Sequence, residues 1–574
     1  MFIKVTTSGG RRYAQLVESF RNEHGSPRQR TVCTLGRVDP GGEVDKLIAA
    51  LQRAQGLDSP AKGIDPLAGL QFLDARAAGD VWALTQLWQA LGLDDLAAAW
   101  RRSRSKLDVL ALFRAMVFNR LCDPQSKLGV MRWLETVALP VEFGLNEGMP
   151  AHQHLLRAMD VIEEHHEALR DRMALLMRPL IDQDLSLVFY DLTTVQTNGM
   201  SEIEGDVRAK GMAKSGLIER QFMLSLVQTS DGLPIDHQVH PGNTAEARTL
   251  LPMIRALVGR YPLKRVVLVA DRGLLSLSNL DELAQLQDTL QAEGIKVRLE
   301  YILAVPAARY GEFAQNLAVL SNSQKAGTQQ VPWVGELEWQ SRRLIVAHDP
   351  LVAQRRTQER RKQIDELIKQ GQQWGGQLDA QDAGQKKRGR PLSDSGAKAR
   401  MYHAVKDAHV ANLIKVDLHQ EEFSFTIDED RQRYLEMLDG KLLLVTNTDS
   451  AAPEVVAHYK SLADIERGFR VLKSDIEIGP VYHRLPQRIR AHAMVCFVAL
   501  VLYRVMRMRL KASKREESPT RLLEQLRRIQ HQTARAADGR KISGLTEINA
   551  NQKSLLLALK LPAPTPGDIQ NPDL

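Results

Sequence analysis

Two apolar runs of this sequence each end in an aspartate. The run LSLVFYD closes at Asp191, and the run RVVLVAD closes at Asp271. Short, nearly continuous apolar runs are typical of strands that are covered on both faces. We therefore expect a sheet with helices packed on it, in which two strands each deliver a carboxylate at or near the carboxyl end.

A third acid, Glu466, lies in the segment YKSLADIERGFRVLK, whose pattern predicts a helix. Tyr459, Glu466 and Lys473 are spaced by seven, so they share one stripe of that helix, and Leu462 and Arg470 lie on the same side. A carboxylate, an aromatic hydroxyl and two cations on one face can bind a metal ion and a DNA phosphate together. An ion pair between Glu466 and Arg470, worth about 0.3–0.5 kcal/mol, would also explain their spacing.

The neighbouring apolar stripe of the same helix is expected to pack it onto the protein. This stripe contains Ile465, Phe469 and Leu472. Gly468 is less favourable than alanine in a helix interior by about 1 kcal/mol. It therefore indicates close approach of another backbone or of nucleic acid at this point of the helix.

The size and charge of the chain set broad limits. At 574 residues it is too long for a single hydrophobic core, so we expect several domains. Its 77 Lys and Arg against 69 Asp and Glu favour a polyanionic partner. The longest apolar run, residues 491–506, is short for a membrane span and predicts a buried helix and no membrane. Buried or free thiols in a reducing cytoplasm are expected for Cys33, Cys122 and Cys496.

The period of the hydrophobic pattern changes near residue 181. The segments SLVFYDLTTV, QFMLSLVQ and LPIDHQVH predict successive strands, and Ser-Asp-Gly between the last two is a hairpin signal. AEARTLLPMIRALVGRY predicts a helix, and VVLVAD predicts a further strand. Three hairpin-linked strands, a helix and another strand match the opening of a ribonuclease H-like sheet.

The predicted fold class is therefore a multidomain α/β protein with an interrupted ribonuclease H-like core. We predict a small N-terminal β unit in residues 1–60, a helical DNA-binding domain in 61–180, the first part of the core in 181–304, a β-rich insertion with a charged helix and a basic linker in 305–450, the second part of the core with Glu466 in 451–515, and a C-terminal helix and tail in 516–574.

The three acids together predict metal-dependent phosphodiester chemistry. Mg²⁺ is a hard ion that prefers carboxylates and water. Two such ions, roughly 3.5–4 Å apart, activate the attacking oxygen, stabilise the leaving oxygen and neutralise charge at phosphorus. Each acid alone has a plainer explanation, because an aspartate at a strand end is often a turn former or a helix cap.

These residues carry a family resemblance. The chain resembles a bacterial insertion-sequence transposase of the DDE type, in the branch with a β-rich insertion before the final Glu. That branch has the signature Tyr, two residues, Arg, three residues, Glu, six residues, Lys, which Tyr459, Glu466 and Lys473 fit. Asp191 in YDLTTV and Asp271 in VADRG match the family's two aspartates. GNTAE and HRLPQRIRAH also look like the family.

Leu462 departs from this signature. In the family an Arg at this position helps to hold a terminal DNA phosphate, and Arg467 and Arg470 are the candidates to replace it here. The resemblance therefore implies DNA-binding roles for Tyr459, Arg467, Arg470 and Lys473.

The resemblance also implies a reaction. The catalytic and metal-binding residues would be Asp191, Asp271 and Glu466, holding two Mg²⁺ ions that Mn²⁺ can replace. The protein would nick double-stranded DNA at the inverted-repeat ends of an element, and the 3′-OH would attack target DNA. Members of this broad group excise through a DNA hairpin. Since two active sites must handle two DNA ends, a homodimer formed on DNA is expected.

Other motifs have plainer interpretations. RGRP within GQKKRGRPLSDSG resembles a minor-groove hook, but a flexible loop is favoured. Stacking of a flipped base is less favoured than core packing for Trp333, Trp339 and Trp374. In each histidine pair the two side chains point in different directions, so we expect a solvated face for His165 and His166 and structural roles for His237 and His240.

Two other functions stay open. A dehalogenase-like phosphohydrolase would use Asp191 as a nucleophile, but it needs a second aspartate where Thr193 stands, and it leaves the stripe around Glu466 unexplained. A DNA-binding protein that has lost catalysis would not need all three acids.

Overall fold

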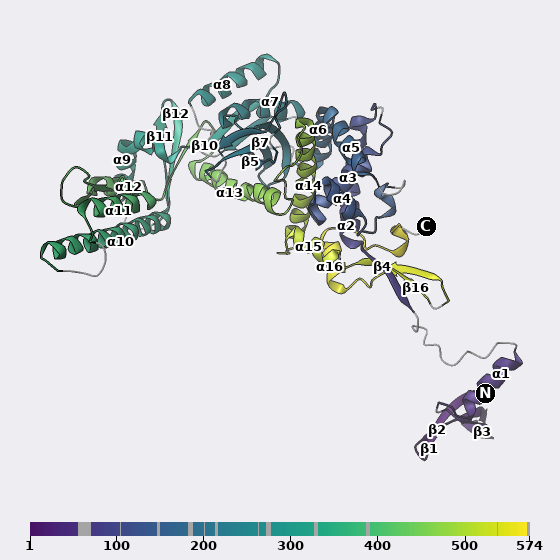
Figure 1. Ribbon diagram of the computed structural model, residues 1–574. Helices are drawn as coiled ribbons and strands as arrows, with labels where there is room; N and C mark the ends of the chain where they lie inside the picture. Colours follow the sequence, from purple (N-terminus) through teal and green to yellow (C-terminus); the bar gives the residue numbers. More distant parts are fainter. Residues whose placement is uncertain are drawn as a thin grey trace. The chain divides into compact units, whose positions relative to one another are not determined.

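The chain folds into two compact units (Figure 1). The computed structural model describes residues 1–23, 25–38, 40–55, 70–103, 105–145, 150–181, 187–199, 201–212, 216–261, 263–270, 277–325, 331–385, 391–536 and 538–570. The smaller unit comprises Met1–Asp74 and Gln532–Ser543, and the larger comprises Ala75–His531 and Gly544–Leu574.

The smaller unit begins with the small β structure that the sequence predicts. Its antiparallel sheet has the order β1-β2-β3. The turn between the first two strands uses Gly9 and Gly10, both with positive φ, which glycine adopts without strain. The elements are β1 (Phe2–Ser8), β2 (Arg11–Arg21), β3 (Pro27–Arg37) and the helix α1 (Glu43–Ala54).

A second three-stranded sheet has the order β17-β16-β4. Its strands are β4 (Gln71–Ala77), β16 (Gln530–Arg535) and β17 (Lys541–Leu545). The sequence predicts only a helix and a tail after residue 516, so the hairpin β16–β17 is a feature that the prediction lacks. It turns at Gly539, which has a φ of 85° and donates its N–H to the carbonyl of Ala536 at 2.9 Å.

The larger unit starts with helices, as the periodicity of residues 80–180 predicts. The segment CDPQSKL forms a turn and a helix cap, in which the Ser126 hydroxyl accepts the N–H of Gly129 at the start of α4. The helices are α2 (Gly79–Ala90), η1 (Leu93–Trp100), α3 (Val109–Cys122), α4 (Lys127–Leu134), α5 (His152–Glu164) and α6 (His166–Met177).

A nine-stranded sheet follows, with the order β11-β12-β15-β10-β9-β5-β7-β6 and with β8 paired to β7. β5 runs parallel to β9 and antiparallel to β7, and β9 runs parallel to β10; the remaining pairs are antiparallel. The strands are β5 (Leu187–Gln196), β6 (Ala209–Met212), β7 (Ile218–Thr229), β8 (Pro234–Pro241), β9 (Arg265–Ala270), β10 (Arg298–Ala304), β11 (Trp333–Trp339), β12 (Arg342–His348) and β15 (Lys441–Thr446).

Helices pack on both faces of this sheet, as the apolar strands predict. Tyr190 of β5 donates its hydroxyl to Thr249, which precedes α7 (Leu250–Arg260) on one face. Phe189 points to the other face and packs against α13 (Ala452–Ser474). The helix α14 (Pro486–Ala512) also contacts β8, and α8 (Leu277–Ala292) packs against α7 and β10.

The segment between β10 and β15 is less rich in strands than the sequence predicts. Of the strands described in this segment, β11 and β12 belong to the large sheet, and helices contain most of the described residues. The charged run QRRTQERRKQIDELIKQ does form a helix, as expected. The other elements are η6 (Ala307–Phe313), α9 (Ala314–Lys325), α10 (Pro350–Asp382), α11 (Asp394–Asp407), β13 (Ile414–Val416), β14 (Phe425–Ile427) and α12 (Glu429–Leu438).

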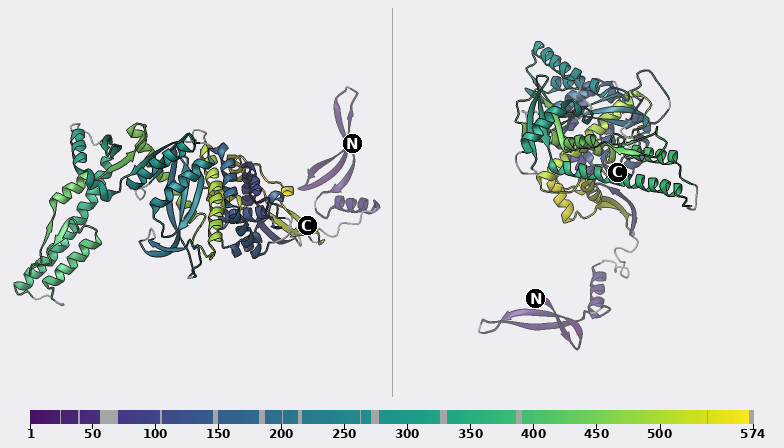
Figure 2. Two further views of the ribbon diagram at one scale, coloured as in Figure 1. Left: turned by 90° about the horizontal axis from the view of Figure 1, so that it is seen from above. Right: turned by 90° about the vertical axis from the view of Figure 1, so that its left-hand side faces the viewer.

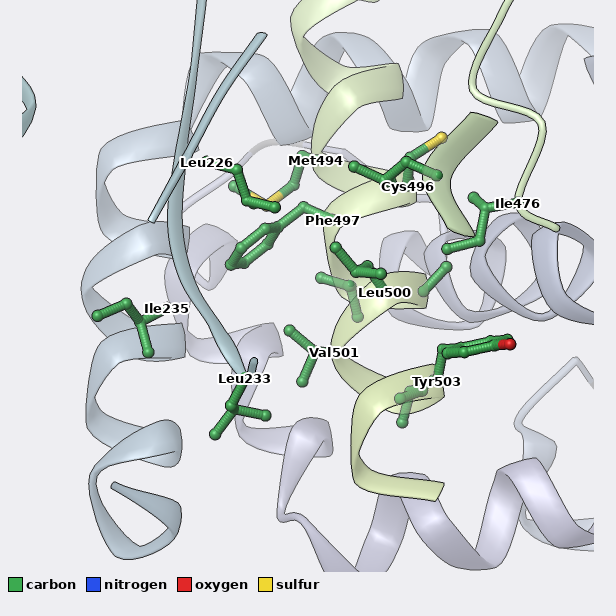
Figure 3. Packing of buried hydrophobic residues seen from close by; sticks show 14 of the residues in the cluster. Leu226, Leu233, Ile235, Ile476, Met494, Cys496, Phe497, Leu500, Val501 and Tyr503 are labelled. Atoms are coloured by element: carbon green, nitrogen blue, oxygen red, sulfur yellow. The ribbon is translucent and has the colours of Figure 1, made fainter. Parts of the chain in front are cut away.

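The helical region and the sheet share one hydrophobic core. The helix α14 lies between them (Figures 1 and 2) and contacts α3, α5 and β8. Figure 3 shows Phe497 and Val501 of α14 facing Leu226 of β7 and Leu233 and Ile235 of the next hairpin arm. α14 is long and apolar enough to cross a bilayer, but most of its apolar stretch is buried within the protein. It is thus the buried helix that the sequence predicts.

Another part of the contact between α14 and the sheet is a buried histidine. His237 of β8 stacks on Phe497, with 4.5 Å between the ring centroids. Burial, reinforced by the charge of Arg170, lowers the pKa of His237 to about 3. In the unfolded chain the imidazole has its ordinary pKa of about 6.5. The unfolded state therefore binds more protons below that pH, and stability is lost as the pH falls from about 6.5 toward 3.

We accordingly expect His237→Phe, which keeps the ring stacking, to lose less stability on acidification than the wild type. The difference between pH 7 and pH 5 should be about 2 kcal/mol, since each pH unit below 6.5 contributes about 1.36 kcal/mol. Denaturant unfolding at the two pH values measures it, with the exposed His403→Phe as control. Equal losses in the wild type and His237→Phe would contradict the assignment.

Candidate active site

Asp191 lies inside β5, in the middle of the large sheet. Its pairing partner on β7 is Leu226, and its own Oδ1 accepts the N–H of Leu192 at 2.7 Å. Because side chains alternate along a strand, Asp191 points to the same face as Phe189, the face on which α13 packs. The carboxylate is only partly buried, so a ligand can approach it.

The neighbouring parallel strand leads to the second aspartate. β9 ends at Ala270, which is in register with Tyr190 of β5. Asp271 is the next residue in the sequence, and it lies outside the described residues. The last residue of β9 is therefore level with the residue that precedes Asp191 in β5.

The third acid belongs to the helix that crosses the same face. α13 packs against β5, β9 and β10, among other strands. The backbone of Glu466 is helical, as predicted, but its side chain lies outside the described part of the chain, as does that of Arg467. Of the predicted apolar stripe, Phe469 and Leu472 are buried in the core.

Leu462, where the sequence departs from the expected arginine, is buried against the sheet. Its side chain is 5% exposed and belongs to an apolar cluster with Val455 and Val456 of α13 and with Phe189 and Val269 of the sheet. The position thus anchors the helix here. The departure from the signature has a packing explanation.

Three residues of the predicted DNA-binding set can be placed. Arg470 and Lys473 are exposed on α13, where they can reach a phosphate. Tyr459 is half-buried and packs at the margin of the apolar cluster around Leu462. The positive charges therefore lie on the accessible part of the helix that carries Glu466.

The close approach at Gly468 involves a side chain. A Cβ at this position would lie 2.7 Å from Nε2 and 3.0 Å from Oε1 of Gln228. The sequence predicts another backbone or nucleic acid here, and instead the near neighbour is the amide of a β7 residue. A Cβ at position 468 would therefore require the Gln228 amide to move.

Buried polar groups hold the turn that follows α13, and no pattern in the sequence marks them. Arg120 donates to the carbonyl of Glu477 at 3.2 Å, and His492 Nε2 lies 3.0 Å from the carbonyl of Ile478. A carbonyl can only accept, so His492 donates from Nε2, and the Nδ1 of the neutral ring is left to accept from Lys127 at 3.3 Å. Burial, with the charges of Lys127 and Arg120, holds the pKa of His492 well below its usual range.

The remaining motifs are structural where they can be placed. Most of RGRP lies outside the described residues, while the following Ser393 caps α11. The predicted packing of the three tryptophans is observed: Trp333 contacts His348, Trp339 contacts Phe313, and Trp374 packs in the core of the inserted segment. The predicted structural roles of histidines also hold, because His240 pairs with Ser225.

The donor set of the predicted centre suits a hard divalent ion. Asp191 offers carboxylate oxygens from a rigid strand, and Mg²⁺ prefers such ligands. Among the residues whose side chains are described, no group of three His, Cys, Asp or Glu could hold a metal ion. Asp271 and the Glu466 side chain do not belong to that set. Thr193, where a dehalogenase-like enzyme needs its second aspartate, is buried.

Comparison with known families identifies the class. Residues 183–502, more than half of the chain, match the model of the transposase DDE domain, so the chain belongs to the DDE transposases. Residues 3–61 match the N-terminal domain of IS1634 family transposases, which places the protein among the insertion-sequence transposases. No curated protein matches the chain. DDE transposase domains generally depend on a divalent metal.

Proposed function

We propose that this transposase nicks DNA at the inverted-repeat ends of its element and joins the 3′-OH to target DNA. The observation that carries the proposal is that α13 packs on the face of the sheet to which Asp191 points, across the two strands that lead to the aspartates. Asp191 lies on β5, the parallel strand β9 stops one residue before Asp271, and α13 with Glu466 packs across both strands.

The strand order supports a ribonuclease H-like core. The strands β5, β7 and β8 are antiparallel neighbours, and β9 and β10 add in parallel on the other side of β5. The inserted segment enters after β10 and returns through β15, which pairs with β10. In this arrangement Glu466 follows the insertion, which explains its distance in sequence from the two aspartates.

Asp191, Asp271 and Glu466 would hold two Mg²⁺ ions. The bound ions would activate the attacking oxygen and stabilise the leaving oxygen at phosphorus. The chain's own residues would fix the carboxylates on rigid elements, so that little reorganisation is needed during the reaction. Arg470 and Lys473, exposed on α13, would bind the phosphates of the strand being cut, with Tyr459 and Arg467 beside them.

The proposed setting is the bacterial cytoplasm, where the protein would act on double-stranded DNA. Its formal charge of +8 at neutral pH favours binding to this polyanion. A homodimer formed on DNA would bring two active sites to two element ends. Excision through a hairpin is the route we propose, because it requires only one such site at each end.

The proposal is tested by incubating the purified protein with DNA that carries the ends of its element. We expect nicks at the ends with Mg²⁺, and none with a chelator. Asp271→Ala should bind the DNA but not cut it, because a metal-binding carboxylate is missing. Equal product from wild type and Asp271→Ala would show that the DDE residues do not cut DNA. Binding without cutting by the wild type would favour a protein that has lost catalysis.

A further inference from the structure

Gln228 is a fully buried amide beside the proposed catalytic centre. It lies on β7 opposite Phe189 of β5 and is 0% exposed. Opposite residues of paired strands point to the same face, so Gln228 shares the face of Asp191. Asp191 pairs with Leu226, which makes Gln228 its diagonal neighbour, a separation of about 7–8 Å that a long side chain can bridge.

The amide of Gln228 makes no hydrogen bond in the part of the chain that the structure describes: neither Oε1 nor Nε2 has a partner there. A buried polar group without a partner costs about 1–3 kcal/mol. A second glutamine of the same strand shows the usual arrangement, since Gln221 donates to the carbonyls of Met212 and Gly242. Such unpartnered groups in a native protein often serve a functional site.

The same amide also contacts α13, the helix that carries Glu466. Its Nε2 and Oε1 lie so close to Gly468 that no Cβ fits between them, and Gly468 is two residues after Glu466. Gln228 therefore lies between the strand that carries Asp191 and the helix that carries Glu466.

We infer that Gln228 is a positioning residue of the metal centre, whose amide N–H donates to a metal-ligating carboxylate when the centre is assembled. The inference rests on the proposed function. Carboxylates that bind metals are themselves usually held by hydrogen bonds, and loss of such a partner typically lowers metal affinity or activity by about 10–100-fold. A neutral amide can orient a carboxylate without competing with the ions for it.

The test uses Gln228→Met, which keeps the length of the side chain and removes the amide. Since the amide has no hydrogen-bond partner among the described residues, the melting temperature measured without metal should stay the same or rise. The Mg²⁺ affinity measured by calorimetry should fall about 10–100-fold, and the Mg²⁺ concentration that half-saturates DNA cleavage should rise to match. DNA binding without metal should not change.

Gln221→Met is the matched control, because it removes a bonded glutamine from the same strand. It should lower the melting temperature without weakening Mg²⁺ binding. A lower melting temperature of Gln228→Met, or Mg²⁺ affinity and cleavage equal to the wild type, would overturn the inference. Failure of the wild type to cut DNA contradicts the proposed function instead, and the calorimetric comparison remains readable in that case.

Discussion

Replacing Asp191 by asparagine is expected to lower the rate of DNA nicking by roughly 10³-fold or more. The change keeps the shape of the side chain and an oxygen that can accept the N–H of Leu192. It removes the negative charge that would bind metal. A metal ion contributes several kcal/mol of charge stabilisation in the transition state, and each 1.36 kcal/mol is a factor of ten in rate.

The measurement is a single-turnover nicking assay on end DNA with Mg²⁺. DNA affinity and the unfolding midpoint should stay near those of the wild type, because Asp191 is only partly buried and does not belong to the core. Asp231→Asn, in the exposed turn between β7 and β8, is the control and should cut normally. Normal nicking by the Asp191 variant would place the catalytic carboxylates elsewhere.

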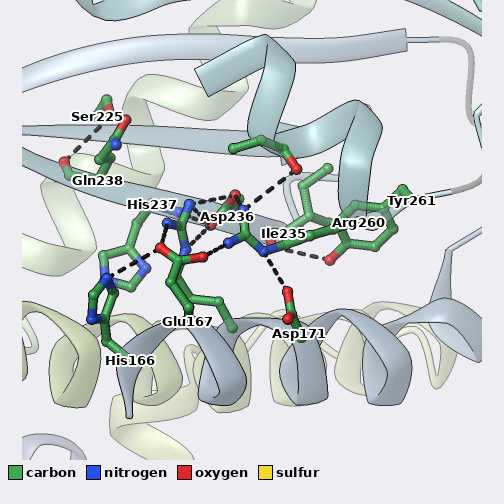
Figure 4. Close-up of polar contacts among 12 residues, drawn as sticks. His166, Glu167, Asp171, Ser225, Ile235, Asp236, His237, Gln238, Arg260 and Tyr261 are labelled. Carbon is green, nitrogen blue, oxygen red and sulfur yellow. Dashed lines mark hydrogen bonds and ion pairs between the residues drawn. The ribbon is translucent and has the colours of Figure 1, made fainter. Parts of the chain in front are cut away.

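Asp236→Ala is expected to destabilise the larger unit by about 3–5 kcal/mol. Asp236 of β8 is buried and accepts hydrogen bonds of 2.8–3.0 Å from Nε and Nη2 of Arg170 in α6 (Figure 4). Arg260 of α7 lies 3.6 Å away and also pairs with Asp171. Removing the carboxylate leaves the buried Arg170 with only the exposed Glu167 as an ion-pair partner, and breaking a buried ion pair by removing one member is costly.

Denaturant unfolding measures this effect. Asp171→Asn is a suitable control, since its side chain is 62% exposed and an exposed ion pair contributes less than about 1 kcal/mol. The double variant Arg170→Met with Asp236→Leu should recover most of the lost stability, because neither charge then remains buried. If Asp236→Ala lowers the free energy of unfolding no more than Asp171→Asn does, the ion-pair network does not stabilise the packing of α6 on the sheet.

The sequence predicts elements where the local pattern decides the structure. The Ser-Asp-Gly signal predicts the turn between β7 and β8, where Gly232 has a φ of 76°. The run before Asp271 predicts β9, and the run 491–506 predicts a buried α14. In each case the residues that set the structure are neighbours along the chain.

The missed features depend on contacts or on weak patterns. The strand β16 reads QHQTAR, and it has too few apolar residues to show alternation, although Asp538-Gly539 is a turn signal that could have found the hairpin. The helix α14 completes the cores of both the helical region and the sheet. Its periodicity cannot predict this, because a periodic pattern shows that a face is buried but not which elements pack on it.

In the candidate site, too, some features are visible in the sequence and others depend on contacts in the fold. A strand ending in an acid and a helix with a seven-residue stripe are visible in the sequence. Leu462 appears there as an exception to a signature, and only its burial against the sheet explains it. Gln228 lies in the apolar run QFMLSLVQ, where nothing marks it, and its importance emerges from its register with β5 and its contact with Gly468.

The position of α14 in the sequence also determines when the helical region can complete its core during synthesis. The helices α2 to α6 are complete by Met177, but α14, which packs on α2, α3 and α5, ends at Ala512, 335 residues later. At a synthesis rate of about 5–20 residues per second, on the order of tens of seconds separate the two. During that interval the helices on the ribosome keep an apolar surface without its cover, so a nascent chain of this protein should be a good client for chaperones that hold exposed apolar segments.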